Sequence, residues 1–321
     1  MRHGRRLTYV VLAAVLAMGS AFAAKLGDPA APLSIEEWIK GQPVDLAAGK
    51  GKQIFVVEFW ATWCPPCRTS IPHLTELQAK YKDKGVTIVG ITDEAVEDAK
   101  PFVEKMGAQM EYTVAIDDDM KTGRDYMGAF EVDTIPHAFI VDKAGIVAWQ
   151  GNPAVDDLEG ALDQILTGTF DIQAAAKADQ ARRAEQAEQM ATMMLRAYYE
   201  MVKEGAETQQ ADALAEHLIT NDPKATDLLN TLAWMILTDK EVKYRNLEMA
   251  LRAAKAAYDA CEGKDTNVVD TYARALFETG KVSQAIEHQK KAIELCQDEQ
   301  IRPELERTLA EYQSKAAATT S

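Results

Sequence analysis

The fold of this 321-residue chain is decided by one stretch, Ile54-Phe55-Val56-Val57-Glu58-Phe59-Trp60-Ala61-Thr62-Trp63-Cys64-Pro65-Pro66-Cys67. Its first half is an apolar run of the kind that forms a buried strand. Two cysteines separated by two residues follow, and prolines are well tolerated in the first turn of a helix. A strand that ends in such a pair and leads into a helix is the layout of a thiol–disulfide exchange site.

The two cysteines are expected to have different roles. If Pro66 opens the helix, Cys64 lies at the helix N-terminus, where free N–H groups and a positive partial charge favour a thiolate. We therefore expect Cys64, as the exposed thiol, to attack and Cys67, one turn further in, to resolve the mixed disulfide. Pro65 and Pro66 stiffen the loop, and Trp63, Pro65 and Pro66 are expected to border the substrate.

A carboxyl group interrupts the apolar strand at Glu58. Strand alternation places Glu58, Trp60 and Thr62 on one face. A carboxylate among apolar residues has a raised pKa, so Glu58 is a candidate acceptor for the Cys67 proton. The alternative is a Glu58 exposed at a sheet edge, with no role.

A second candidate feature is Thr134-Ile135-Pro136, which precedes an apolar run. Proline cannot donate a hydrogen bond to a strand ladder, and a cis peptide bond is a proline feature. A trans bond is the default for such a pair. The cysteine motif favours the alternative, a cis Ile135–Pro136 bond beside the thiols, with Ile135 offering backbone groups to an extended substrate.

Strand and helix signals alternate over the first half of the chain. Strands are predicted at 54–60, 86–91 and 112–116, with a hairpin of 137–141 and 146–150. Helices are predicted at 66–82, 94–106, 123–130 and 156–166. Ser34-Ile35-Glu36-Glu37 has the form of a helix capping box. This order predicts an α/β domain with a mixed sheet and flanking helices.

The second half of the chain has only helical signals. Residues 169–204 predict a long connecting helix, because they are rich in strong helix formers. Residues 205–315 predict an all-α helical-repeat domain, and 316–321 a disordered tail. The repeat is weak, so a generic helical bundle is the alternative. Stacked helix pairs present a surface to a partner protein, and we expect one here.

The N-terminus predicts export. Residues 1–23 have a positive segment, an apolar segment and small residues before a cleavage site, which is the pattern of a signal peptide. We expect a protein that is periplasmic or otherwise extracytoplasmic, soluble after cleavage and in a compartment that permits disulfides. An uncleaved membrane anchor is the alternative. The net charge of −15 argues against nucleic acid as a partner.

Residues 57–68, with Pro72 and Ile135-Pro136, resemble the exported TlpA/ResA-like branch of the thioredoxin superfamily over about residues 50–168. The resemblance implies a thioredoxin fold, a redox-active Cys64–Cys67 pair, a buried acid at Glu58 and a cis-proline at Pro136. The Cys-Pro-Pro-Cys variant also resembles tryparedoxins, but the export signal disfavours them. Residues 267–295 resemble a tetratricopeptide unit, whose small-residue positions fall on Ala273, Gly280, Ala285 and Ala292.

Other polar residues are set aside. Asp117-Asp118-Asp119 lacks the glycine and distal glutamate of a calcium loop, and the histidines show no ligand spacing, so we predict no metal and no cofactor. Cys261 and Cys296 are expected to be free thiols rather than a disulfide, because equivalent positions on packed helices lie about 8–10 Å apart.

The leading hypothesis is therefore an exported thiol–disulfide oxidoreductase that acts on protein disulfides or thiols. A reductant or isomerase is favoured over an oxidant, because Glu58 accepts a proton and no histidine separates the cysteines. A reductant requires electrons from a membrane donor. The alternatives are a thiol peroxidase and a partner-recruiting repeat protein with an accessory redox domain.

Overall fold

The computed structural model describes residues 23–205, 208–221 and 225–320. The chain divides into two compact units, one up to Arg182 and one from Arg183 onward. The predicted signal peptide, residues 1–23, lies outside the described residues except for its last position. Within the described ranges, no helix is long and apolar enough to span a membrane.

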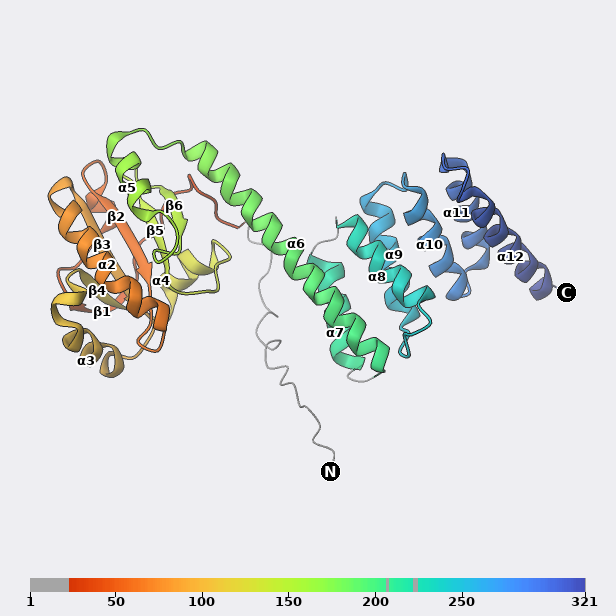
Figure 1. Ribbon diagram of the computed structural model, residues 1–321, viewed down its shortest axis with the longest axis horizontal. Helices are drawn as coiled ribbons and strands as arrows, with labels where there is room; N and C mark the ends of the chain where they lie inside the picture. The colour runs from red at the N-terminus through yellow and green to blue at the C-terminus, as the bar shows by residue number, and fades with distance from the viewer. Residues whose placement is uncertain (1–22, 206–207, 222–224, 321) are drawn as a thin grey trace, which may run out of the picture. The chain divides into compact units, whose positions relative to one another are not determined.

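The first unit is built on a mixed six-stranded sheet in the order β1-β4-β3-β2-β5-β6 (Figure 1). The strands are β1 (Ile35–Lys40), β2 (Ile54–Phe59), β3 (Val86–Thr92), β4 (Thr113–Asp117), β5 (His137–Val141) and β6 (Val147–Gly151). β2 pairs in parallel with β3 and antiparallel with β5, and β3 pairs in parallel with β4. β1 and β6 are antiparallel edge strands. The predicted mixed sheet and the predicted hairpin of β5 and β6 are confirmed.

Helices cover both faces of this sheet. They are α1 (Leu46–Gly49), α2 (Pro65–Tyr81), α3 (Val96–Met106), α4 (Lys121–Gly123) and α5 (Leu158–Thr167), with the short turns η1 (Lys82–Lys84), η2 (Gly107–Met110) and η3 (Arg124–Gly128). On one face, Ile54 and Val56 of β2, with Trp60 directly after the strand, share a core with α2 and α5. On the other face, β2 packs against η3 and the start of the next helix, α6 (Ile172–Glu204). Phe55, Val57 and Phe59 face this side, so the predicted alternation holds within β2, whereas Ala61 after the strand shares the core of Trp60.

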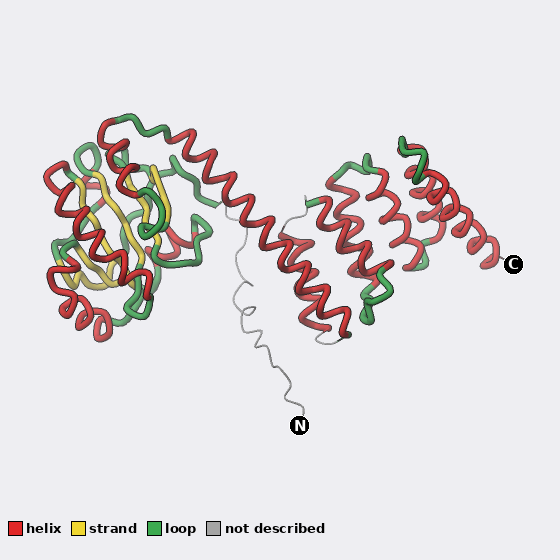
Figure 2. The backbone as a smooth tube through the Cα atoms, viewed as in Figure 1, coloured by secondary structure: helices red, strands yellow, loops and turns green. Residues whose placement is uncertain are grey.

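Among its described residues, the second unit contains helices and no strands (Figure 2). The long helix α6 (Ile172–Glu204) leads to α7 (Thr208–Asn221), α8 (Thr226–Thr238), α9 (Leu247–Ala260), α10 (Thr266–Glu278), α11 (Val282–Leu295) and α12 (Arg302–Thr320). Ala273, Ala285 and Ala292 are fully buried. Gly280 has φ +80° between α10 and α11, a conformation that glycine adopts without strain. The predicted all-helical region is confirmed.

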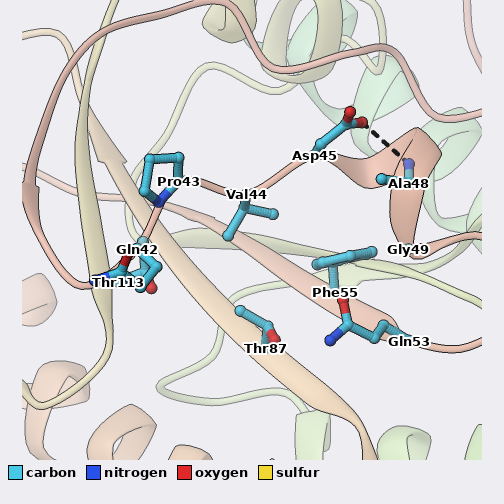
Figure 3. A pocket seen from close by; sticks show the side chains of 10 residues that line it. All are labelled: Gln42, Pro43, Val44, Asp45, Ala48, Gly49, Gln53, Phe55, Thr87 and Thr113. Atoms are coloured by element: carbon cyan, nitrogen blue, oxygen red, sulfur yellow. Dashed lines mark hydrogen bonds between the residues drawn. The ribbon is translucent and has the colours of Figure 1, made fainter.

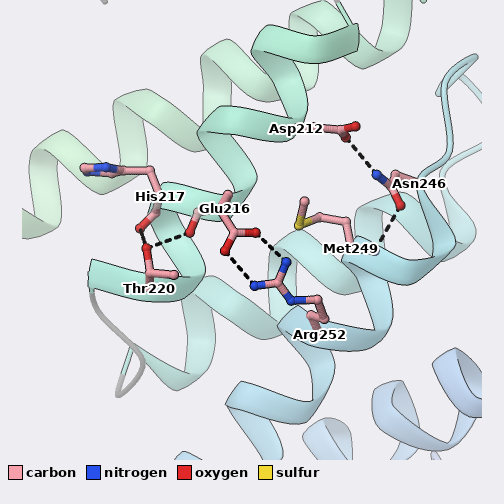
Figure 4. A network of polar contacts seen from close by, with 7 residues as sticks. All are labelled: Asp212, Glu216, His217, Thr220, Asn246, Met249 and Arg252. Atoms are coloured by element: carbon pink, nitrogen blue, oxygen red, sulfur yellow. Dashed lines mark hydrogen bonds and ion pairs between the residues drawn. The ribbon is translucent and has the colours of Figure 1, made fainter. Parts of the chain in front are cut away.

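Polar contacts join α7 to α9 on the surface of this unit (Figure 4). The Arg252 guanidinium makes two hydrogen bonds to the Glu216 carboxylate. Asn246 Nδ2 donates to Asp212 Oδ1 at 3.0 Å, and Asn246 Oδ1 accepts from Met249 N–H at 3.1 Å. Asn246 therefore caps α9 and links it to α7.

Two predictions of local structure were wrong. Residues 34–37 do not begin a helix, because the chain forms the edge strand β1 and pairs with β4. Ladder hydrogen bonds and the burial of apolar side chains against the sheet outweigh a four-residue capping signal. Residues 316–320 belong to α12 rather than to a disordered tail, and Ala316, Ala317 and Ala318 are strong helix formers.

Candidate active site

The cysteine pair lies where the central strand β2 ends and α2 begins. Cys64 and Cys67 form a disulfide, with Cα atoms 5.3 Å apart. Cys64 is the N-cap of α2, which begins at Pro65, one residue earlier than predicted. Its Sγ accepts the Cys67 N–H at 3.2 Å, so a sulfur atom occupies the position that a capping oxygen takes in other helices. The helix N-terminus therefore stabilises negative charge on Cys64.

Both sulfurs are shielded in this disulfide state. Cys64 is 2% exposed and Cys67 is fully buried. The expected exposure of the attacking thiol is therefore not met here, although Cys64 is the more exposed of the two. Trp63 is 66% exposed beside it, and Pro65 and Pro66 are also exposed. These three side chains form a solvent-facing rim around Cys64.

The Ile135–Pro136 peptide bond is cis, as expected. Cys64 Sγ lies 3.8 Å from the carbonyl oxygen of Ile135. Ile135 is half-buried, and Pro136 is buried directly before β5. The loop before β5 and the start of α2 thus meet at Cys64, although they are about 70 residues apart in the sequence.

Glu58 lies in the middle of the sheet, which excludes the exposed edge position considered above. Its side chain is fully buried, and neither carboxyl oxygen has a hydrogen-bond partner among the described protein atoms. Burial raises the pKa of Glu58 to about 8, because low polarity disfavours the charged form. The residues beside it in the neighbouring strands are Gly90 in β3 and Ala138 in β5, which are both small.

A residue that we did not select from the sequence braces the loop before Cys64. Glu94 accepts from Thr62 N–H and from Thr62 Oγ1, both at 2.6 Å, and from Thr92 Oγ1 at 3.2 Å. Arg68 Nε donates to Thr62 O at 2.8 Å. The available signal was topological, because Glu94 follows β3, the parallel neighbour of β2, and the ends of parallel strands meet at one edge.

A polar chain on the opposite face of the sheet was also missed. His137 Nε2 and Gln150 Oε1 are 3.0 Å apart, and Gln150 Nε2 donates to Asp179 Oδ1 at 2.9 Å. Arg182 pairs with Asp179 at 2.5 Å. Burial lowers the pKa of His137, which therefore stays neutral and donates through Nε2. These hydrogen bonds attach the first turns of α6 to β5 and β6.

A pocket of about 390 Å³ lies at the other end of the sheet (Figure 3). It is lined by residues at the beginnings of β2, β3 and β4, such as Phe55, Thr87 and Thr113. The Asp45 carboxylate there caps α1 through Ala47 and Ala48. Because the cysteines follow the opposite end of β2, this pocket is separate from the redox site.

Two further cysteines lie in the helical unit. Cys261 and Cys296 are free thiols, as expected. Cys261 contacts the Tyr258 carbonyl oxygen and Cys296 the Asp298 carbonyl oxygen. The only disulfide among the described residues is therefore Cys64–Cys67.

A cysteine pair that caps a helix at the end of a central strand, beside a cis-proline, defines a thiol–disulfide oxidoreductase with a thioredoxin-like fold. Residues 26–150 match the AhpC/TSA family. The ResA thiol-disulfide oxidoreductase of Bacillus anthracis is 37% identical over 138 residues, which are 42% of this chain and 76% of that protein. The ResA of Geobacillus kaustophilus is 33% identical over 129 residues, 40% of this chain and 71% of that protein. The chain belongs to the ResA family of thiol-disulfide oxidoreductases.

Among solved structures, a putative thiol:disulfide interchange protein DsbE from Chlorobium tepidum is 30% identical. The match covers 46% of this chain and 98% of that one, with a TM-score of 0.38. The helical unit lies outside the AhpC/TSA match.

Proposed function

We propose that this protein is an exported reductant or isomerase of protein disulfides, in which Cys64 attacks, Cys67 resolves and Glu58 accepts a proton. The observation that carries the proposal is the position of Cys64 Sγ at the N-cap of α2, where it accepts the Cys67 N–H. The same interaction that caps the helix stabilises the Cys64 thiolate after reduction. The adjacent Ile135 carbonyl and the exposed rim of Trp63, Pro65 and Pro66 support an extended substrate at this position.

The reaction proceeds in two exchange steps. The Cys64 thiolate attacks one sulfur of a substrate disulfide, a mixed disulfide forms, and the other substrate sulfur leaves as a thiolate. Cys67 then transfers its proton to the Glu58 carboxylate and attacks Cys64 Sγ, which breaks the mixed disulfide and releases the second substrate sulfur. The substrate gains two electrons, and the protein returns to the Cys64–Cys67 disulfide. A dithiol donor must reduce it again, and we propose a membrane-bound donor.

Reduction of insulin by the full chain, with dithiothreitol as electron donor, tests these roles. Cys64→Ser abolishes turnover, because no attacking thiol remains. Cys67→Ser accumulates mixed disulfides, because the second step fails. Cys296→Ser in the helical unit is the matched control and leaves activity unchanged. Intact activity in Cys64→Ser would refute the mechanism.

The direction of electron flow follows from the reduction potential. Among proteins of this fold, the reductant thioredoxin has a potential of about −270 mV and a strong oxidant one of about −120 mV. We expect a value close to the first, measured by equilibration with glutathione or dithiothreitol redox buffers. A value close to the second would make the protein an oxidant.

Export and partner recruitment belong to the same proposal. Residues 1–23 support a signal peptide, and the disulfide suits an oxidising compartment. The helix pairs from α7 to α12, with small buried residues such as Ala273 and Ala285, support a tetratricopeptide-like domain that recruits a protein partner. N-terminal sequencing of the mature protein tests the first point, with cleavage after Ala23 expected.

A further inference from the structure

Four buried polar atoms, on three side chains that approach Gly90, have no hydrogen-bond partners among the described protein atoms. They are both carboxyl oxygens of Glu58, Nε1 of Trp60 and the hydroxyl of Tyr112. A methyl group added at Gly90 would lie 3.2 Å from Glu58 Oε2, 3.2 Å from Trp60 Nε1 and 2.9 Å from Tyr112 Cε2. The three side chains therefore converge on one point, and the absence of a side chain at Gly90 leaves room for them. Buried polar groups without partners are uncommon in folded proteins and call for an explanation.

Tyr112 supplies a permanent donor to this cluster. It is 5% exposed and stands one residue before β4. Burial raises the pKa of Tyr112 well above its ordinary value, and the charge of Glu58 raises it further. The hydroxyl thus stays protonated at neutral pH, and the charge of Glu58 acts on it. Cε2, the ring atom at Gly90, is bonded to the carbon that carries this hydroxyl.

The other elements packed against Glu58 bring no charge to it. Gly90 in β3 and Ala138 in β5 have no ionisable group. From α2, Cys67 lies in the same hydrophobic core as Trp60 and Tyr112 and is held in the disulfide. From α3, the Phe102 ring lies 5.5 Å from that of Trp60. Burial is the cause of the raised pKa of Glu58, with no charged partner contributing.

We propose that Tyr112 is a positioning residue for Glu58: its hydroxyl donates a hydrogen bond to the Glu58 carboxylate when that carboxylate becomes charged, with the Trp60 N–H as a second donor. This inference rests on the proposed role of Glu58 as the acceptor of the Cys67 proton. A hydrogen bond to a charged group is stronger than one to a neutral group. Tyr112 therefore favours the charged form of Glu58, and it lowers the pH at which that form becomes available to Cys67.

The test is a ¹³C NMR titration of the Glu58 side-chain carboxyl in the oxidised full-length chain, where the cysteine pair does not titrate. Tyr112→Phe keeps the ring and removes only the hydroxyl. We expect it to raise the pKa of Glu58 by about one to two units, the effect of losing a hydrogen bond to a charged group. Tyr126→Phe is the matched control, because Tyr126 is equally buried but faces the other side of the sheet, where its hydroxyl donates to Ala31 O at 2.7 Å. It should leave the titration unchanged.

A kinetic arm separates this inference from the function on which it rests. In insulin reduction, Tyr112→Phe should shift the acid limb of the pH–rate profile to higher pH by the same number of pH units. Tyr126→Phe should leave the profile unchanged. An unchanged Glu58 titration in Tyr112→Phe would overturn the role of Tyr112. If Glu58→Gln left the rate and its pH profile unchanged, the role of Glu58 in the reaction would fall, and the titration alone would still decide whether Tyr112 stabilises its charge.

Discussion

At the residue scale, the role proposed for Glu58 comes with a cost in stability. Burial raises its pKa from 4.5 to about 8, so between these pH values the folded protein holds a proton that the unfolded chain has lost. The free energy of unfolding therefore falls as the pH rises through this window. A core residue selected only for stability would not be a carboxylic acid, which suggests that position 58 is kept for chemistry.

The first prediction follows from this linkage. Glu58→Gln should be more stable than the wild type above pH 8, with a gain that shrinks as the pH falls towards 4.5 and an upper bound of about 5 kcal/mol. Urea unfolding of the oxidised protein at pH 5 and pH 9 measures it. Glu97→Gln, on the exposed side of α3, is the control and should show no such gain. An equal effect of Glu58→Gln at both pH values would contradict burial as the cause.

The second prediction concerns Glu94, which holds the loop before Cys64. Glu94→Gln replaces one acceptor oxygen with a donor, so Thr62 N–H or Thr62 Oγ1 loses its partner. We expect a loss of about 1–2 kcal/mol in the free energy of unfolding and slower insulin reduction. A loosened loop should leave the pKa of Glu58 unchanged. The pH–rate profile of the Glu94→Gln variant should therefore keep the shape of the wild-type profile. A shifted profile would instead indicate an electrostatic role for Glu94.

The sequence was most informative where one residue type admits a single explanation. The pairing of Cys64 with Cys67, the burial of Glu58 and the cis bond at Pro136 agree with expectation, whereas the exposure of Cys64 does not. Glu94, Tyr112 and Gln150 were not found. Their importance comes from strand neighbours and from contacts across the sheet, and a single sequence does not display these pairings.

At the element scale, the same contrast separates the central strands from the edge. β2 and β3 were predicted to within one residue, since strands buried on both faces are continuous apolar runs. β1 was mistaken for a helix start, because a partly exposed edge strand carries polar residues such as Glu36 and Glu37 that also suit a helix terminus. Only the pairing with β4 decides between the two.

The third prediction concerns the attachment of α6 to the sheet. Gln150→Leu removes both bonds of the central amide, so the His137 N–H and the Asp179 carboxylate each lose a buried partner. We expect the free energy of unfolding to fall by about 1–3 kcal/mol. We also expect faster amide hydrogen exchange in residues 172–182. Gln173→Leu, an exposed change on the same helix, is the control. Unchanged exchange in Gln150→Leu would show that apolar packing alone holds the helix.

At the scale of the whole molecule, the two units have separate hydrophobic cores. The cores on the two faces of the sheet draw their members from residues 24–176, and the core of the helical unit draws its members from residue 191 onward. The residues assigned to the exchange reaction, Cys64, Cys67 and Glu58, all belong to the first unit. Chemistry and partner choice are therefore expected to be separable.

A chain that ends at Gln189 tests this separation, because it keeps every member of the first unit's cores and omits the apolar residues that pack in the second. We expect it to fold, by circular dichroism, and to reduce insulin as fast as the full chain, since a small model substrate needs only the exchange site. The same truncation carrying Cys64→Ser should be inactive. If the truncated chain folded but no longer reduced insulin, the helical unit would contribute to the exchange step itself, and a role confined to recruitment would be wrong.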